Sequence, residues 1–268
     1  IVIHGTGHYV AKGEMYGKKS TITIKYLDRI SASNSKFGTA YKERAKAIGS
    51  YFRDEFEKVV SKEYQYPAYY RDKLIKNYIY KGPVLEWYAR IKTRMEDNYS
   101  FFHNLIPFKA QIIDVGCGYG FLPYMLGFLS DGRKITGIDY DEDKIDVANN
   151  CLSKDQNINF VCADVTRYNF ALSDVFILND VLHYLPFREQ RQLISNCIIN
   201  LNKGGMIIIR DADKDLKKRH FYTRLSEFYS TNFGFNKTVN DLEFVSGKEV
   251  LKIAKETNME VQVFDNTT

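Results

Sequence analysis

The sequence lacks the features that would cross-link it or hold it in a membrane. No run of 18 apolar residues occurs, so we expect no transmembrane helix. The four cysteines include no C-x-x-C pair and no Cys/His spacing typical of a zinc site, which favours reduced thiols in a cytoplasmic protein. An initiator Met and a signal peptide are also absent, and this opening predicts a piece of a longer polypeptide.

The net charge of +5 is unevenly distributed. Residues 1–110 hold 20 Lys and Arg against 11 Asp and Glu, whereas the rest of the chain holds 18 against 22. A solvated basic face explains this asymmetry as well as attraction to anionic phospholipid head groups does. We keep both interpretations, the second implying peripheral contact with the cytoplasmic membrane face. No nucleic-acid-binding motif is present, so we expect no nucleic-acid partner.

Three segments follow one another along the chain. Residues 1–60 are expected to form an α+β segment, with strands near residues 1–3 and 21–27 and a helix over residues 39–60. Residues 61–106 are rich in Tyr and are broken by Pro67 and Gly82-Pro83, which predicts a linker or cap of short helices. Two of these helices are expected from residue 84 toward 95 and over 98–105.

Residues 107–268 alternate between short apolar runs and amphipathic stretches. Strands are predicted at residues 111–115, 134–139, 159–162, 175–179 and 206–210. Helices are predicted between them, at residues 121–129, 141–152 and 188–201. Such alternation is typical of βαβ units, so we expect an α/β fold with a doubly wound, mainly parallel sheet. A further helix over 246–256 and a sixth strand over 259–264 complete the prediction.

A glycine-rich turn follows the first of these strands, in the segment Ile112-Ile113-Asp114-Val115-Gly116-Cys117-Gly118-Tyr119-Gly120-Phe121. Glycines there let a ligand approach the backbone closely, at the carboxyl end of a parallel strand. Phe121 departs from the dinucleotide fingerprint, and a carboxylate at Asp114 would repel a pyrophosphate. The segment resembles the first motif of class I S-adenosylmethionine-dependent methyltransferases, whose cofactor carries a cationic amino group that an acid would suit.

The later segments resemble the other motifs of that family, in the same order. Asp139 ends the second strand 19 residues after Gly120, as does an acid that grips ribose hydroxyls. The resemblance implies that Asp164 and Val165 meet the adenine ring and that residues 175–186 lie beneath the methyl group. Residues 201–209 resemble the L-x-x-G-G turn into the fifth strand. Taken singly, Asp114 has the alternative interpretation of a helix N-cap partner and Asp164 that of a turn cap, but the shared order of the motifs disfavours both alternatives.

The resemblance implies S-adenosylmethionine as the cofactor and a seven-stranded type of sheet. Residues 265–268 are too few for its last strand, so we expect either a trimmed chain or an open sheet edge. The predicted cofactor-binding residues are Asp114, Gly116, Cys117, Gly118, Gly120, Asp139, Tyr140, Asp164, Val165, Asn179 and Asp180.

One segment limits the chemical class of the methyl acceptor: Asn179-Asp180-Val181-Leu182-His183-Tyr184. It lacks the N/D-P-P-Y/F pattern of enzymes that methylate adenine or glutamine, and it resembles small-molecule and lipid methyltransferases. His183 is a candidate general base, the alternative being a packing histidine or one on the adenine side. Asp180, Asp211 and Asp213 might be imagined as a metal cluster, but the last two are expected in solvent at a strand end, so no metal is predicted.

Aromatic residues predict a pocket for a small, hydrophobic or lipid-like acceptor that is methylated on oxygen or carbon. The alternative for each aromatic residue is ordinary core packing. The candidate pocket residues are Trp87, Tyr88, Tyr99, His183, Tyr184 and Tyr222.

Residues 1–60 resemble the C-terminal end of lysophosphatidate-type acyltransferases, in their two strands followed by a basic helix. The H-x-x-x-x-D pair of that family is absent, because Tyr9 and Gly13 stand five places after His4 and His8. The resemblance therefore implies a catalytic acyltransferase domain upstream in a longer parent chain. Two rival functions follow: a cofactor-binding regulatory domain of such a fusion protein, and a dinucleotide-dependent oxidoreductase, which Phe121 and Asp114 disfavour.

Overall fold

The computed structural model describes residues 1–4, 22–32, 34–61, 63–95, 98–211, 243 and 245–264. The chain forms two compact units, residues 1–70 and 71–268, and each is described by itself. The division into three segments at residues 60 and 106 stays a prediction. None of the helices in the described ranges combines the length and the hydrophobicity needed to cross a bilayer.

The first unit contains a two-stranded antiparallel sheet and a long helix. Strand β1 (Val2–His4) pairs with β2 (Thr23–Lys25), and α2 (Tyr41–Val60) packs against this sheet, with short 3₁₀ helices η1 (Ser35–Phe37) and η2 (Glu63–Gln65) on either side of it in the sequence. Lys25 Nζ reaches Glu55 of α2 at 2.5 Å and Lys58 Nζ reaches it at 2.7 Å. These two hydrogen bonds lower the pKa of Glu55 to about 2.

The isoleucines of this small sheet face outward. Val2 and the side chains of Thr23 and Lys25 are more buried than their neighbours, because they are on the side of the sheet that α2 covers. The apolar residues that alternate with them are about half exposed or more: Ile1, Ile3, Ile22, Ile24 and Tyr26. The alternation predicted from the sequence is therefore present, but its apolar side is not the one that packs on the helix.

The second unit is built on a five-stranded parallel sheet in the order β5-β4-β3-β6-β7. Its strands are β3 (Ala110–Val115), β4 (Arg133–Asp139), β5 (Ile158–Cys162), β6 (Ser173–Asn179) and β7 (Leu201–Arg210). All five predicted strands are present within one or two residues, except that β7 starts five residues earlier than expected. The predicted doubly wound, Rossmann-like α/β fold is confirmed.

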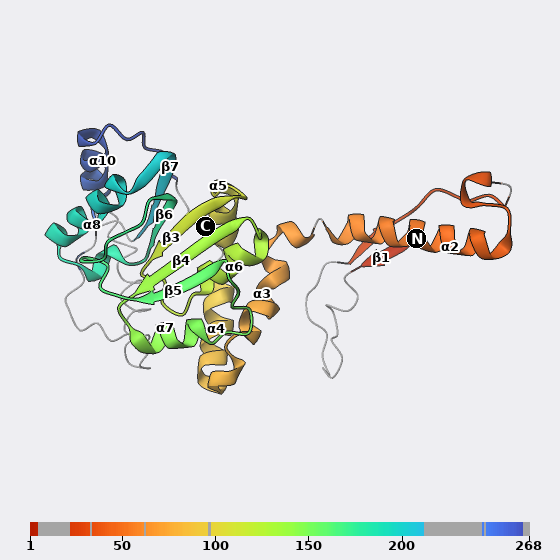
Figure 1. The fold of residues 1–268 in the computed structure, drawn as a ribbon, viewed down its shortest axis with the longest axis horizontal. Helices are drawn as coiled ribbons and strands as arrows, with labels where there is room; N and C mark the ends of the chain where they lie inside the picture. Colours follow the sequence, from red (N-terminus) through yellow and green to blue (C-terminus); the bar gives the residue numbers. More distant parts are fainter. Residues whose placement is uncertain are drawn as a thin grey trace. The chain divides into compact units, whose positions relative to one another are not determined.

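Helices lie on both faces of this sheet (Figure 1). Helices α6 (Phe121–Leu129) and α7 (Glu142–Asn149) pack on one face, and α8 (Phe187–Ile199) and α10 (Gly247–Glu256) contribute to the apolar core on the other. The helices that precede the sheet are α3 (Pro67–Lys76), which begins in the first unit, the short η3 (Ile79–Lys81), α4 (Pro83–Met95) and α5 (Tyr99–Leu105). Residues 163–172, between β5 and β6, hold no helix.

The predicted sixth strand is wrong. Residues 259–264 follow α10 as extended chain without strand pairing, and Val261, Val263 and Phe264 are exposed by 43%, 79% and 51%. Their alternation is typical of a strand, but strand formation needs a hydrogen-bonded neighbour. Among the described residues, no strand lies beyond β7 for them to pair with.

A buried arginine ties three elements together. Arg133, at the start of β4, donates to the carbonyl oxygens of His103 (3.2 Å), Ile106 (2.7 Å), Pro107 (3.0 Å) and Leu126 (3.2 Å). Its Nη1 also lies 3.1 Å from His103 Nδ1. These carbonyls belong to the ends of α5 and α6, where helix dipoles favour a cation. Burial lowers the pKa of Arg133 to about 10, and burial together with the Arg133 charge lowers the pKa of His103.

Candidate active site

The glycine-rich turn between β3 and α6 is fixed by the backbone that surrounds it. Gly116 and Gly120 have φ angles of +76° and +77°, a region that L side chains avoid. A Cβ added at Gly116 would lie 2.5 Å from Val181 Cγ2, and one added at Gly120 would lie 2.6 Å from the Phe160 ring. Gly120 is also the N-cap residue of α6. The turn therefore requires glycine at both positions for shape and for space.

Hydrogen bonds join this turn to the end of β4. The backbone N–H groups of Gly116 and Cys117 donate to Ile138 O at 2.8 and 3.1 Å. Gly118 N donates to Asp139 Oδ2 at 2.8 Å, and Asp141 N donates to Asp139 Oδ1 at 2.9 Å. Each carboxylate oxygen has a second lone pair, so Asp139 keeps acceptor capacity for the two hydroxyls of a ribose. The structure thus brings Asp139 and the glycine turn together, as predicted.

Two carboxylates give the centre of the site negative charge. Asp114 and Asp139 are buried, with 3% and 7% of their surfaces exposed. Burial, and next the charges of Asp114 and Asp139, raise the pKa of the neighbouring Cys117 thiol well above its usual value. Cys117 is therefore a neutral thiol, and the fixed negative charges suit a cationic ligand.

The adenine side of the predicted site is more exposed. Asp164 Oδ1 accepts hydrogen bonds from Thr166 N (2.9 Å) and Thr166 Oγ1 (2.7 Å), so this acid caps a turn, as its alternative interpretation held. Val165 is buried in the core, and Tyr140 is 54% exposed. The adenine contacts of Asp164 and Val165 stay predictions.

The residues that end β6 are bound by a residue that the sequence analysis missed. Arg210, the last residue of β7, lies opposite Asn179 in the strand register. Its Nη1 donates to Asn179 Oδ1 at 3.1 Å and to Asp180 Oδ2 at 2.5 Å. Asp180 has a positive φ of 53°, which is uncommon outside glycine and often marks functional turns.

The position of Asp211 differs from the one predicted from the sequence. It was expected in solvent at the strand end, but its side chain is fully buried and lies 2.7 Å from His183 Nδ1. Asp211 Oδ2 also accepts from the backbone N–H groups of Leu182 (2.9 Å) and His183 (3.3 Å). Strand β7 runs parallel to β6, so the residue after Arg210 reaches the turn that follows Asp180. Asp180 and Asp211 therefore have different basic partners rather than a shared metal-like cluster.

The geometry fixes the roles of the two ring nitrogens. An ionised carboxylate can only accept, so the hydrogen bond at Nδ1 requires the proton on that nitrogen. In neutral His183, Nε2 is then the basic nitrogen. The Tyr184 ring lies 4.2 Å from the His183 ring, between centroids.

The aromatic residues predicted to line the acceptor pocket lie in different environments. The Tyr88 ring lies 6.0 Å from Tyr119 and 6.1 Å from Phe121, beside the glycine turn. Trp87 is 55% exposed, and Tyr99 is buried in α5, as its packing alternative requires. Tyr222 lies outside the described residues.

Two further residues hold the glycine turn and were not predicted. Tyr78 Oη donates to Tyr119 O at 2.9 Å, and burial raises the pKa of Tyr78 well above its usual value. Lys144 Nζ lies 5.8 Å from the centre of the Tyr119 ring and 3.9 Å from Asp141 Oδ2. No motif in the sequence marks either residue, because both act through contacts with the turn from other elements.

Comparison with known proteins agrees with this site. Residues 112–205 match a family described as a methyltransferase domain. The chain is 28% identical to a ubiquinone biosynthesis O-methyltransferase of Coxiella burnetii over 148 residues, which are 54% of this chain and 61% of that protein. It is also 28% identical to the enzyme of the same name from Rickettsia typhi over 156 residues, 58% of this chain and 61% of the relative. The chain therefore spans less than two thirds of the length of these relatives.

A solved structure with a similar course of the chain is human N-acetylserotonin methyltransferase in complex with its cofactor. The TM-score is 0.48 at 20% identity, over 65% of this chain and 49% of that one. The match of residues 112–205 to a methyltransferase domain supports the S-adenosylmethionine-dependent type, and the cofactor, predicted from the sequence. The match does not extend to residues 1–60, whose resemblance to acyltransferases stays a prediction.

Proposed function

We propose that the second unit transfers a methyl group from S-adenosylmethionine to an oxygen of a small hydrophobic or lipid-like acceptor. The observation that carries this proposal is the His183–Asp211 pair. His183 lies in the turn after β6, where the family resemblance puts the methyl group, and Asp211 follows the neighbouring strand β7. A hydroxyl acceptor must lose its proton during the transfer, and an imidazole oriented by a carboxylate is suited to take it.

The residues of the turn fit the cofactor. A Cβ at Gly118 would meet no atom within 4 Å, so the turn has open space there for a ligand. Asp114 and Asp139 provide buried negative charge for its cationic amino group and acceptors for its ribose. When bound, S-adenosylmethionine supplies a methyl group on a positively charged sulfur. We infer that Gly116, Gly118 and Asp139 hold it, with Tyr78 and Lys144 fixing the turn through Tyr119.

His183 would act as the general base. Methyl transfer would form a bond between the acceptor oxygen and the methyl carbon and break the carbon–sulfur bond, whose electron pair would stay on the sulfur. The hydroxyl proton would pass to Nε2 of His183, and Asp211 would stabilise the resulting imidazolium through Nδ1. Acceptors methylated on carbon would need the same proton removal, one step later.

The acceptor class is supported by two observations. Both relatives named above are O-methyltransferases of ubiquinone biosynthesis by name, which favours a phenolic, lipid-like acceptor here. Tyr88 and Tyr184 place aromatic rings next to the glycine turn and next to His183. Aromatic walls with one basic group are typical of sites for such acceptors.

The alternative is a domain that binds the cofactor without turning it over and regulates an acyltransferase in a longer parent protein. Only the resemblance of residues 1–60 favours it.

Calorimetric titration of S-adenosylmethionine and S-adenosylhomocysteine into the whole chain and its Asp139→Asn variant tests the site. We expect binding in about the micromolar range, weakened about 10- to 100-fold by the substitution, because charge-assisted hydrogen bonds to the ribose are lost. Asp131→Asn, in the exposed turn before β4, is the matched control and should change nothing.

Turnover is then assayed with phenols, catechols and quinols that carry alkyl chains. Methylation of any of them supports the enzyme. Cofactor binding with no methylation of the whole panel would favour the regulatory alternative, and no binding to the unsubstituted chain would refute both.

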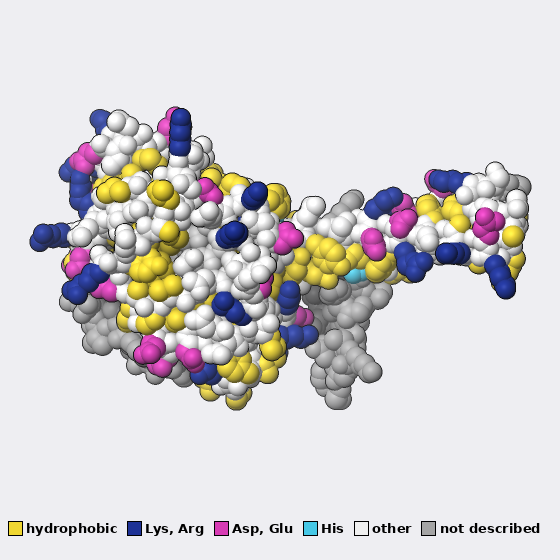
Figure 2. Space-filling view, viewed as in Figure 1, with side chains coloured by type: hydrophobic (Ala, Val, Ile, Leu, Met, Phe, Trp, Pro, Cys, Tyr) yellow, Lys and Arg dark blue, Asp and Glu magenta, His cyan; other side chains and the backbone are white. Residues whose placement is uncertain are grey.

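We also propose that the first unit contacts an anionic membrane surface. Residues 1–70 hold 12 Lys and Arg against 7 Asp and Glu, a net charge of +5, while the rest of the chain is balanced at 26 against 26. Figure 2 shows Lys and Arg side chains along this unit, interspersed with Asp and Glu side chains and with hydrophobic patches. Five exposed apolar side chains lie on or next to β1 and β2, and an apolar face next to basic groups is typical of peripheral membrane binding.

A further inference from the structure

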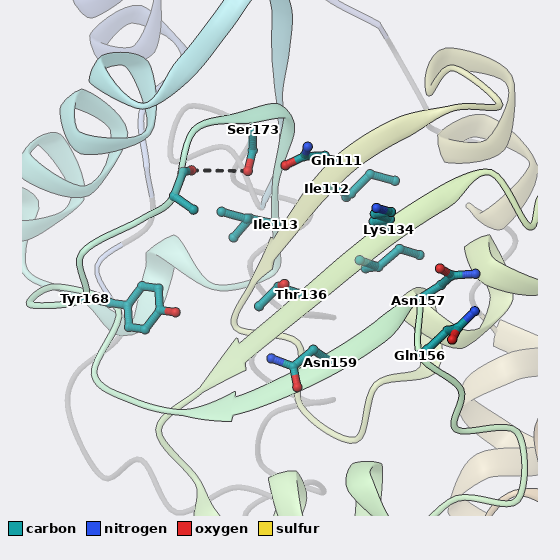
Figure 3. Close-up of a pocket in the computed structure, with 12 residues that line it drawn as sticks. Gln111, Ile112, Ile113, Lys134, Thr136, Gln156, Asn157, Asn159, Tyr168 and Ser173 are labelled. Atoms are coloured by element: carbon teal, nitrogen blue, oxygen red, sulfur yellow. Dashed lines mark hydrogen bonds between the residues drawn. The ribbon is translucent and has the colours of Figure 1, made fainter.

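A cavity of about 560 Å³ lies on the sheet of the second unit, away from the methyltransferase site. Its floor is formed by the first halves of β3, β4 and β5. Figure 3 shows Tyr168 on one side of it and Gln156 and Asn157 on the other, with the strands between. Asp139, at the cofactor end of β4, is five positions after Lys134 on the floor, which is about 16 Å of extended chain.

Among the described residues, no helix covers the part of the sheet face where the cavity lies. Residues 163–172, which link β5 to β6, contain no helix, although sheets of this type are normally covered on both faces. Val165 and Phe170 of this connection fill the core over the carboxyl halves of the strands. The amino halves of β3, β4 and β5 are left open to the cavity.

Polar side chains occupy most of the strand positions that face the cavity. On one face, Gln111 and Lys134 are register partners on β3 and β4, and Thr136 and Asn159 are register partners on β4 and β5. The next residues on that face toward the carboxyl ends, Ile138 on β4 and Val161 on β5, belong to the core or pack against it. A strand buried on both faces would be apolar throughout, so the polar row belongs to the open cavity.

These side chains are not used by the fold. Within the described part of the chain, no hydrogen bond involves the side-chain atoms of Gln111, Lys134 or Asn159, and all three residues are exposed. Ser173 differs, because its hydroxyl donates to Ala171 O at 3.2 Å. Lys134 is the one charged residue among the described lining residues.

We propose that this cavity binds a polyhydroxylated ligand about the size of a monosaccharide, with an anionic group directed at Lys134. Carboxamides and hydroxyls both donate and accept, as neighbouring hydroxyls of a sugar do, so Gln111, Asn159 and Thr136 match that chemistry. Ile113 and Ala171 add apolar surface for the C–H groups of a sugar ring. The volume lies within the usual range for small-molecule sites. This ligand is not the methyl acceptor, since the cavity is at the opposite ends of the strands.

The test is a set of NMR titrations of the isotope-labelled whole chain with three probes: glucose 6-phosphate, glucose and inorganic phosphate. We expect saturable shifts of backbone amides at residues 111, 134–136, 156–159 and 168, with glucose 6-phosphate binding at about millimolar or lower concentration. Glucose should bind several-fold more weakly, and phosphate alone more weakly again.

Two variants with matched controls make the test specific. Lys134→Gln should reduce the affinity for glucose 6-phosphate to that for glucose, whereas Lys76→Gln, on α3, should not. Asn159→Leu should weaken both sugars at least about fivefold, whereas Asn104→Leu, exposed on α5, should not. Each variant should bind S-adenosylhomocysteine as the unsubstituted chain does, which shows that the fold is intact.

Three results would overturn the proposal. They are the absence of saturable shifts with glucose 6-phosphate, shifts that map to the cofactor end of the strands, and phosphate binding as tight as that of the sugar phosphate. The last would mean that Lys134 attracts anions of any shape.

Discussion

The Asp211 carboxylate accepts three hydrogen bonds from two consecutive residues, Leu182 and His183. It therefore fixes both the backbone of the turn after β6 and the imidazole ring. Such an arrangement orients a base more firmly than a single side-chain contact would, because ring rotation and turn movement are opposed together.

Asp211→Asn tests whether this pair handles a proton. The amide keeps the shape but cannot stabilise an imidazolium, so we expect kcat to fall by about 10²-fold or more. The acidic limb of the pH–rate profile should move as well. Titration of S-adenosylhomocysteine is the control and should be unchanged. A loss of stability with an unaltered pH–rate profile would mean that Asp211 is only structural.

The positions of Asp114 and Asp139 could be predicted because each ends an apolar strand, and strand ends are visible in the local sequence. Arg210 and Asp211 could not be placed, because their partners are 28 to 31 residues away and are set by the register between β6 and β7. One signal was available: residues ending two neighbouring parallel strands must meet at the same edge of the sheet.

At the scale of elements, the turn between β3 and α6 is the part that tolerates change least. Gly120 and Gly204 have nearly the same φ, +77° and +79°, but different surroundings. A Cβ at Gly120 would meet the Phe160 ring at 2.6 Å, whereas none of the neighbouring atoms lies within 4 Å of a Cβ at Gly204. Comparing alanine substitutions at the two positions therefore distinguishes the effect of backbone strain from that of side-chain crowding.

Gly204→Ala should lower the free energy of unfolding by about 1–2 kcal/mol, from left-handed backbone strain alone. Gly120→Ala should lose about 1–3 kcal/mol more, because the Phe160 ring must move. Chemical denaturation of both variants measures the difference. Equal losses would show that the Phe160 ring yields without cost.

The core strands could be predicted because a buried strand is a short apolar run between turn residues. The sixth strand could not, because its alternation resembles that of a real strand and only a hydrogen-bonded neighbour distinguishes the two. The absence of a helix between β5 and β6 is visible in the sequence in another way. Polar residues at Gln111, Lys134 and Asn159 interrupt strands that are otherwise apolar.

At the scale of the whole molecule, charge and catalytic chemistry belong to different units. The whole net charge is carried by residues 1–70, and the methyltransferase motifs lie in the balanced remainder. A membrane-contacting unit of this kind would bring the second unit to a lipid-like acceptor without changing its active site.

Vesicle sedimentation tests this division of roles. The whole chain should sediment with vesicles that contain phosphatidylserine, more weakly with phosphatidylcholine alone, and less at high salt, because screening weakens the attraction. Ile3→Glu combined with Ile24→Glu should reduce binding about tenfold or more, since apolar contact is lost and negative charge is added. Leu152→Glu, 83% exposed in the second unit, is the control. Equal binding of all variants would contradict the proposed face.

Arg133 links several segments of the second unit. Its guanidinium, on the first residue of β4, donates to carbonyl oxygens at the ends of α5 and α6 and just after α5. If one of these segments moved away, a buried cation would lose hydrogen-bond acceptors. Local opening of one of them is therefore suppressed, and they should exchange their amide hydrogens as one cooperative group.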